Sequence, residues 1–306
     1  MTASPPASPS GLADSHPVQD RDEARGDPRG MKPHRWPMGA TILVLRMVVY
    51  GTLSRSRQGV DGGGWSRQGG WSQMADWYPD EVRLAGRENL DVEHVARYDA
   101  KMDSRAEDEV SLLRQHGLTV GSRIVEFGAG TGQFTAAASR AGARVIAVDV
   151  SEPMLEHLRR KVAHEHLRNV ELVQAGFLSF VSDGEPADFV YSRYAFHHLP
   201  DFWKAVALVR MSQLLRPGGI LRLWDVVYDF DPRDADQRIE AWCALGGTDV
   251  EGEWSRAEFQ EHVRDEHSTF RWLLEPMILK AGFTILELTY SPQTFDAQYV
   301  LQLTAS

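Results

Sequence analysis

The stretch VEFGAGTGQFT, residues 125–135, places Gly128, Gly130 and Gly132 directly after a short apolar run that contains an acid. Residues 122–127 carry branched side chains at their centre, which is typical of a buried strand, and an alanine-rich helical segment follows the glycines. Glycine lacks a Cβ atom, so a turn made of it can adopt a positive φ and let a ligand lie against the backbone. The stretch therefore predicts a ligand-binding turn between a strand and a helix.

The chain beyond residue 104 alternates between helical and strand patterns. Helical patterns cover residues 106–115, 134–141, 153–166, 202–215 and 270–281. Strand patterns cover residues 122–127, 143–150, 169–174, 188–192 and 220–227, and a final pair starts at residues 283 and 297. Strands separated by helices imply right-handed crossovers and helices on both faces of a sheet. We therefore predict a doubly wound α/β fold, with a seven-stranded, mostly parallel, Rossmann-like sheet and a C-terminal antiparallel hairpin.

Charge and cysteine content limit the partners of the chain. The formal net charge of -10 argues against duplex binding, because neutralising phosphates needs clustered Lys and Arg, so we expect a small-molecule substrate and no nucleic acid. Cys243 is the single cysteine, which excludes a disulfide framework and a cysteine zinc site within the chain. We expect Cys243 to be a buried apolar residue, with a nucleophile as the alternative, and the composition suits a cytoplasmic protein.

The N-terminal part differs in composition from the remainder. Residues 1–37 hold 7 of the 15 prolines and show no apolar period, which predicts disorder. Residues 38–53 are apolar, but Arg46 interrupts a run that is already shorter than the roughly 20 residues of a spanning helix. We predict no stable membrane insertion, with a peripheral amphipathic contact as the alternative. Residues 59–73 are glycine-rich and typical of a linker.

These patterns divide the chain. Residues 1–73 are predicted to be a disordered or dispensable extension, and residues 74–306 to be the globular domain. Within that domain, residues 228–270 interrupt the alternation and are predicted to be a lid or substrate-covering insertion. Apolar side chains at Trp242, Trp254 and Trp272 would line its pocket, with ordinary core packing as the alternative. In the helix at residues 202–215, Phe202, Val206 and Val209 share one face.

Two ligand classes use a glycine turn of this kind, dinucleotides and S-adenosylmethionine. The dinucleotide fingerprint G-x-G-x-x-G requires glycine at position 133, where this chain has Gln133. Glu126 precedes the glycines, where a carboxylate repels a pyrophosphate but not an ammonium or sulfonium cation. Asp149 ends the second strand and is placed to accept both ribose hydroxyls of either ligand. The spacing and the acid together favour S-adenosylmethionine.

Four segments, in order, carry a resemblance to a known family: VEFGAGTGQFT, VIAVDVSEPMLE, DFVYSRYAFHHLPD and LLRPGGILRLWD. With them the chain resembles the class I S-adenosylmethionine-dependent methyltransferases over about residues 90–306. The resemblance implies that Glu126 and the glycine loop hold the methionine portion of the cofactor, that Asp149 binds the ribose and that Tyr98 belongs to an N-terminal lid. The cofactor-binding residues it implies are Tyr98, Glu126, Gly128, Ala129, Gly130, Gly132, Asp149, Val150, Met154, Phe177, Ser192, Arg193 and Tyr194. Relatives commonly carry an acid after the third strand for the adenine amine, whereas this chain has Gly176, so adenine recognition is expected to fall to backbone groups.

Methyl transfer from a sulfonium needs the acceptor to be positioned and, for some acceptors, deprotonated. His197 and His198 follow the fourth strand, where the methyl group would project, and histidine titrates near neutrality. His197 is the predicted catalytic base; the alternative is that one histidine braces the next helix while the other packs beside the substrate. His262 and Glu266 have a spacing that could bind a metal, but a solvated helix face is expected instead and no metal is predicted.

No N-P-P-Y or D-P-P-Y follows the fourth strand and no Pro-Cys is present, so the known signatures of DNA-base methylation are missing. We therefore predict S-adenosylmethionine-dependent methyl transfer to a small organic molecule, with O-, N- and C-acceptors open. A catalytically silent S-adenosylmethionine-binding or scaffold protein is the first alternative, and a nicotinamide-dependent oxidoreductase is the second. The sequence leaves the acceptor, the pathway and the oligomeric state open.

Overall fold

The computed structural model describes residues 75–86, 105–247 and 254–304. The predictions for residues 1–73 and for Tyr98 lie outside these ranges. Within them, no helix combines the length and apolar character needed to cross a membrane.

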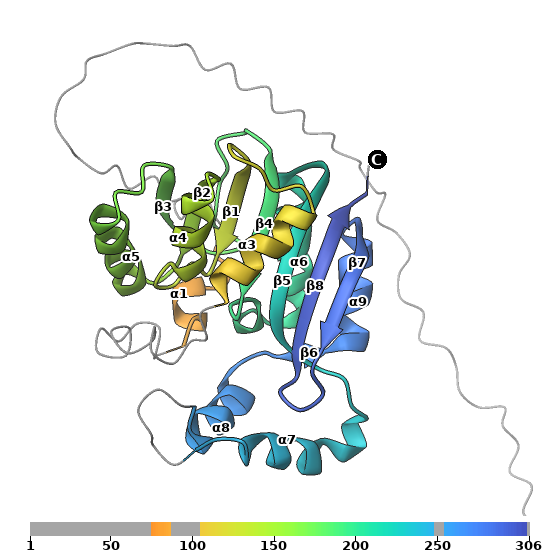
Figure 1. Ribbon diagram of the computed structural model, residues 1–306. Helices are drawn as coiled ribbons and strands as arrows, with labels where there is room; N and C mark the ends of the chain where they lie inside the picture. The colour runs from red at the N-terminus through yellow and green to blue at the C-terminus, as the bar shows by residue number, and fades with distance from the viewer. Residues whose placement is uncertain (1–74, 87–104, 248–253, 305–306) are drawn as a thin grey trace, which may run out of the picture. The chain divides into compact units, whose positions relative to one another are not determined.

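The centre of the fold is a sheet in the order β3-β2-β1-β4-β5-β8-β7 (Figure 1). The strands on this path are β1 (Arg123–Phe127), β2 (Arg144–Asp149), β3 (Val170–Gln174), β4 (Ala187–Arg193), β5 (Leu215–Tyr228), β7 (Phe283–Tyr290) and β8 (Asp296–Leu303). The first five pair in parallel, whereas β8 pairs antiparallel with both β5 and β7. The predicted fold class and hairpin are therefore confirmed. The two-residue strand β6 (Thr269–Phe270), which pairs with β5, was too short for its pattern to reveal.

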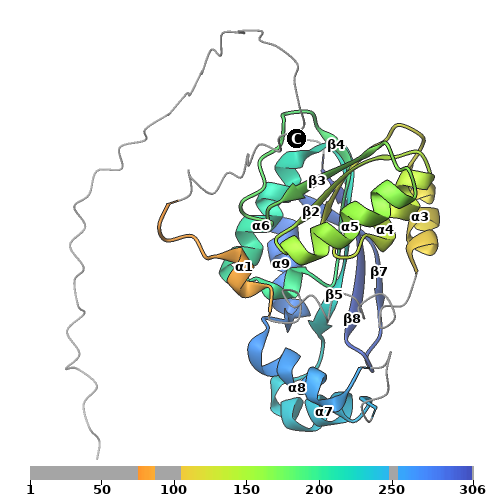
Figure 2. The same cartoon turned by 90° about the vertical axis from the view of Figure 1, so that its left-hand side faces the viewer.

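Helices cover both faces of this sheet. The α-helices of the described residues are α1 (Glu81–Leu84), α3 (Ala106–Gln115), α4 (Gln133–Arg140), α5 (Glu152–His164), α6 (Asp201–Leu214), α7 (Ala235–Cys243), α8 (Arg256–Asp265) and α9 (Arg271–Lys280), of which five pack on the sheet faces. One apolar core packs α3, α4 and α5 against one face, and another packs α6 and α9 against the opposite face. Figure 2 views the sheet nearly along its plane, with these two helix layers on either side. Because both faces are covered, every residue of β1 is buried.

The three apolar residues that share one face of α6 differ in exposure. Phe202 is 65% exposed and Val209 is 43% exposed, whereas Val206 is partly buried and packs against the core. The helix buries Lys204, Ala207, Leu208 and Met211. The buried ammonium group of Lys204 donates to the carbonyl of Leu199 at 2.6 Å.

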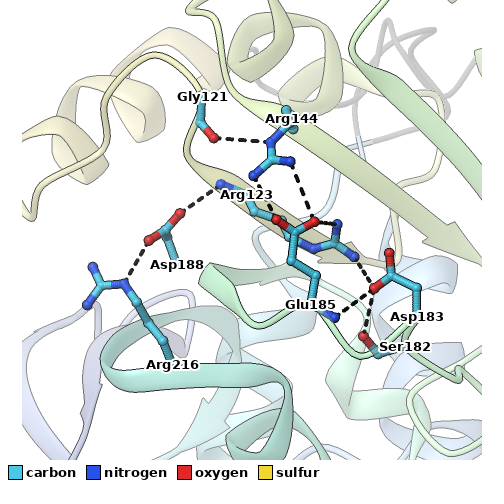
Figure 3. A network of polar contacts seen from close by, with 8 residues as sticks. All are labelled: Gly121, Arg123, Arg144, Ser182, Asp183, Glu185, Asp188 and Arg216. Atoms are coloured by element: carbon cyan, nitrogen blue, oxygen red, sulfur yellow. Dashed lines mark hydrogen bonds and ion pairs between the residues drawn. The ribbon is translucent and has the colours of Figure 1, made fainter.

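A charged network closes the amino ends of the central strands (Figure 3). The Asp188 carboxylate accepts hydrogen bonds from the Arg123 backbone N–H at 2.9 Å and from Arg216 Nε at 2.7 Å. Glu185 accepts from the guanidinium groups of Arg123 and Arg144. This end of the sheet is therefore occupied by ion pairs, and the ligand-binding loops lie at the opposite, carboxyl ends of the strands.

We predict that Gly132→Ala destabilises the protein strongly. Gly132 has φ +79°, and a Cβ there would lie 2.1 Å from Cδ1 of Leu158. The left-handed backbone and the overpacking together should lower the free energy of unfolding by about 2–4 kcal/mol, measured by urea denaturation. Gly117→Ala is the matched control, because Gly117 also has a positive φ but a Cβ there meets nothing within 4 Å, so about 1 kcal/mol is expected. Equal losses in the two variants would show that Leu158 is not the constraint.

Candidate functional site

A cavity lies at the carboxyl ends of β1, β2, β3 and β4. Its lining residues come from the loops after these strands and from α1: Glu81, Leu84, Ala85, Phe127, Gly128, Gly130, Asp149, Val150, Met154, Ala175, Gly176, Phe177, Arg193, Tyr194, Ala195, His198 and Leu199. Ligands of doubly wound sheets bind at this edge. The set contains eight of the predicted cofactor residues, namely Gly128, Gly130, Asp149, Val150, Met154, Phe177, Arg193 and Tyr194.

The glycine loop has the strained backbone that its composition suggested. Gly128, Gly130 and Gly132 all have positive φ values, of 70°, 53° and 79°. A Cβ on Gly128 would lie 2.3 Å from the Cβ of Ala195, so only glycine allows the loop after β1 to approach the loop after β4 this closely. The loop therefore exposes backbone, not side chains, to the cavity.

Asp149 joins this loop to the end of β2. Its Oδ2 accepts a hydrogen bond from the Gly130 N–H at 2.8 Å, and its Oδ1 accepts one from the Ser151 N–H at 2.8 Å. Burial raises the pKa of Asp149, while these backbone donors act in the opposite direction. A carboxylate has about four acceptor positions, so the remaining ones are free for hydroxyl groups of a ligand in the cavity.

Glu126, Ala129, Gly132 and Ser192 were predicted to contact the cofactor, but they do not line the cavity. Glu126 is buried and accepts a hydrogen bond from the Thr135 hydroxyl of α4. Burial raises its pKa to about 8, and the nearby charge of Asp149 adds to the effect. Glu126 is therefore protonated near neutral pH, and its contact with Thr135 links the end of β1 to the first turn of α4.

Val150, Met154 and Phe177 form an apolar part of the cavity near the ends of β2 and β3. Phe177 stacks on Phe127 with ring centroids 5.0 Å apart, which fixes the plane of its ring. Ser151 caps α5 by accepting a hydrogen bond from the Met154 N–H, and this cap sets the position of Met154. The slot between these residues has the shape and polarity for a flat heterocycle.

Glu81 is a cavity residue that the sequence analysis missed. It lies on α1, far in sequence from the loops that follow the strands, and its carboxylate accepts hydrogen bonds from the backbone N–H groups of Leu178 and Ser179, each at 3.0 Å. No local motif marks it, since an acid in the first turn of a short helix is ordinary.

The two adjacent histidines have different surroundings. His197, the predicted base, does not line the cavity: its Nδ1 lies 2.6 Å from Asp225 Oδ1 and its Nε2 lies 3.1 Å from Glu266 Oε2. Burial alone would lower the pKa of His197, but Asp225 and then Glu266 raise it overall. His198 lines the cavity instead, and burial together with the charge of His197 lowers its pKa to about 3.

The prediction that His262 and Glu266 lie on a solvated helix face is wrong. The side chains of His262 and Glu266 are only 14% and 10% exposed, and Glu266 contacts both His262 and His197. Burial disfavours the charge on Glu266, but these histidines lower its pKa to about 2. Ligand-type atoms of His197, His198 and Glu266 lie within 4.8 Å of one another. The carboxylate is already paired with two imidazoles, and the predicted absence of a metal stays a prediction.

Only one of the three lid tryptophans is buried. Trp242 packs with Phe295 and Tyr228 in a small core that also holds Val226, whereas Trp254 and Trp272 are exposed. None of the three lines the cavity described above. Trp242 therefore fits core packing, whereas the exposed Trp254 and Trp272 neither line the cavity nor belong to that core.

Comparison with known proteins identifies the family. Residues 124–219 match a family model described as a methyltransferase domain. An uncharacterized methyltransferase of Geobacillus kaustophilus is 34% identical over 164 residues, covering 54% of this chain and 70% of that relative. The chain belongs to the class I S-adenosylmethionine-dependent methyltransferase family. Because the family uses S-adenosylmethionine, this methyltransferase is not the nicotinamide-dependent oxidoreductase that was the second alternative.

Solved structures of class I methyltransferases and of a cyclase share the fold of this methyltransferase. The magnesium protoporphyrin IX methyltransferase of Synechocystis, solved with bound S-adenosylmethionine, covers 76% of this chain and 100% of its own, with a TM-score of 0.51 and 14% identity. The cyclase SpnF covers 74% of this chain and 97% of its own, with a TM-score of 0.55 and 14% identity. Identities this low show the fold alone.

S-adenosylmethionine is the cofactor of this methyltransferase, and the cavity fits it on three counts. A Cβ would fill the backbone cradle at Gly128, Asp149 offers free acceptor positions, and the slot beside Phe177 and Met154 is apolar. The carboxylates of Asp149 and Glu81 also suit a cation better than a pyrophosphate.

We predict that Glu126 makes the methyltransferase less stable as pH rises. Its pKa of about 8 in the folded state lies above its ordinary value of 4.5, so the folded state holds the proton more tightly. The resulting stability is complete below the unfolded pKa and is lost as pH rises through the folded pKa. Urea denaturation between pH 5 and 9 should show a smaller decline for Glu126→Gln, which keeps the shape without the charge. Parallel curves for the two proteins would contradict the prediction.

Proposed function

We propose that this chain transfers the methyl group of S-adenosylmethionine to a small organic molecule. The observation that carries the proposal is the continuity of the cavity, which runs from Asp149 and the glycine loop to Arg193, Tyr194 and His198 after β4. The first part has the groups that suit the cofactor, and the second offers polar side chains to an acceptor. With a net charge of -10, the chain is poorly suited to a nucleic-acid acceptor.

We also propose that residues 228–270 cover the acceptor, within a domain of residues 74–306. In Figure 1, α7 and α8 lie beyond the carboxyl end of β5. His262 of α8 packs on His197 with ring centroids 4.8 Å apart, and His197 packs on the cavity residue His198 at 4.4 Å. In this proposal the segment reaches the acceptor end of the cavity through these tilted and edge-on imidazole contacts.

His197 serves in this proposal as a positioning residue. Asp225 holds its ring and also accepts hydrogen bonds from the Phe196 and His197 N–H groups at 2.8 and 3.2 Å, which fixes the turn after β4. His198 then faces the acceptor as a neutral imidazole that can accept a hydrogen bond. Because its pKa is about 3, it is a weak base. This arrangement suits an acceptor atom that already carries an available lone pair.

The second candidate is an S-adenosylmethionine-binding protein without methyltransferase activity. His198, the histidine among the described cavity residues, has a pKa of about 3 and is a weak base, and the cyclase SpnF shows that the fold is compatible with another named activity. Incubation of the full chain with methyl-labelled S-adenosylmethionine and a panel of small amines, phenols, carboxylates and thiols separates the two. Labelled product supports the enzyme, and cofactor binding without transfer to any acceptor favours the second candidate.

We predict that Asp149→Ala weakens binding of S-adenosylhomocysteine by roughly 10- to 100-fold, because hydrogen bonds to a charged group are worth about 1.5–3 kcal/mol. Calorimetric titration of the full chain measures the change, and NAD should not bind. Glu185→Ala is the matched control, because this carboxylate belongs to the ion-pair network at the opposite ends of the strands and should leave the affinity unchanged. Binding of NAD, or unchanged affinity in Asp149→Ala, would refute the proposed cofactor site.

A further inference from the structure

The space beside Gly176, just after β3, is filled by a side chain from another part of the chain. A Cβ on Gly176 would lie 2.4 Å from Oε1, 2.5 Å from Cδ and 2.7 Å from Oε2 of Glu81. The carboxylate of Glu81 thus occupies the volume that an acidic side chain at position 176 would take. Glu81 belongs to α1, which precedes every strand of the sheet along the chain.

The orientation of this carboxylate is fixed by three donors. Oε1 accepts from the Leu178 N–H at 3.0 Å, and Oε2 accepts from the Ser179 N–H at 3.0 Å and from the Ser179 hydroxyl at 2.7 Å. Glu81 is only 4% exposed, yet it lines the cavity. A carboxylate has about four acceptor positions, two on each oxygen. One position on Oε1 therefore remains for a donor from a ligand.

The neighbours of Glu81 indicate what kind of donor would meet it. Leu84 of α1, the following Ala85, and Ala175 and Phe177 after β3 also line the cavity, and all are apolar. Burial raises the pKa of Glu81, which shows that its charge is poorly solvated there. A flat apolar ring that carries an N–H donor at its edge would fill this space and stabilise the charge.

We propose that Glu81 accepts a hydrogen bond from the exocyclic amine of the cofactor's adenine and so selects adenine over other bases. Asp149 occupies the ribose side of the cavity, and the apolar slot between the two carboxylates takes the ring. The recognition of the base then depends on α1 docking against the loop after β3. This inference rests on the proposed function in that S-adenosylmethionine occupies this cavity.

A purely structural role for Glu81, as a cap for the loop at residues 176–179, makes a different prediction. A structural cap would affect every ligand of the cavity alike, whereas an acceptor for the amine affects only ligands that carry the amine. The natural probe is S-inosylhomocysteine, in which a carbonyl oxygen replaces the amine of S-adenosylhomocysteine. The ratio of the two affinities therefore reports on Glu81 even if a variant is less stable.

Calorimetric titration of the full chain should show that the wild type binds S-adenosylhomocysteine at least about tenfold more tightly than S-inosylhomocysteine. Glu81→Gln keeps the size of the side chain; with its oxygen toward the two Ser179 donors it gives up the hydrogen bond from the Leu178 N–H and can present an amide N–H to the carbonyl, so the ratio should fall toward one or reverse. Asp80→Ala is the matched control. It removes the carboxylate that caps α1 through the Val82 and Arg83 N–H groups, but it does not touch the cavity, so the ratio should persist.

A charge relocation tests the same geometry. Glu81→Ala should lose most of the preference for adenine, and adding Gly176→Asp to that variant should restore it, because the new carboxylate fills the vacated volume. Gly176→Asp alone should weaken binding, since two carboxylates then compete for one space.

A wild-type chain that binds neither ligand would overturn the proposed cofactor site and this inference with it. A wild type that binds S-adenosylhomocysteine with no preference over the inosine analogue overturns this inference alone. An unchanged ratio of the two affinities in Glu81→Gln also overturns this inference alone. So does a folded double variant, Glu81→Ala with Gly176→Asp, that shows no preference for S-adenosylhomocysteine.

Discussion

The close approach of Gly128 to Ala195 joins the two halves of the cavity. The loop after β1 and the loop after β4 meet where a Cβ on Gly128 would lie 2.3 Å from Ala195. One loop carries Gly130, whose N–H holds Asp149, and the other leads into the histidine pair. The two loops can approach this closely only because Gly128 has no side chain.

Buried carboxylates give this cavity its charge preference. Burial raises the pKa values of Glu81, Glu126 and Asp149, but their partners differ. Asp149 and Glu81 each accept two backbone N–H groups, which favour the charged form, whereas Glu126 has the Thr135 hydroxyl as its partner and titrates at about 8. The cavity therefore has a carboxyl group held by backbone N–H donors at each of its two ends, which suits a cationic cofactor better than a pyrophosphate.

The local patterns in the sequence predicted the fold and part of the site. Apolar periodicity located the five parallel strands and the hairpin because each pattern depends on neighbours within a few residues. The glycine turn and Asp149 were also recognisable, since their spacing follows from one strand–turn–helix unit. By contrast, no local pattern reveals that Lys204 of α6 is buried, because its ammonium group donates to the carbonyl of His267, far along the chain.

The sequence by itself determined the doubly wound sheet, the glycine turn and the carboxylate at the end of β2, because hydrophobic period and turn chemistry act locally. Tertiary structure decided which of two adjacent histidines faces the cavity, since His197 is turned away by Asp225 and by Glu266 from the chain's C-terminal part. It also brought Glu81 into the space beside Gly176. Such contacts join segments far apart in the chain, so their formation depends on how the helices pack on the sheet, which no local pattern records.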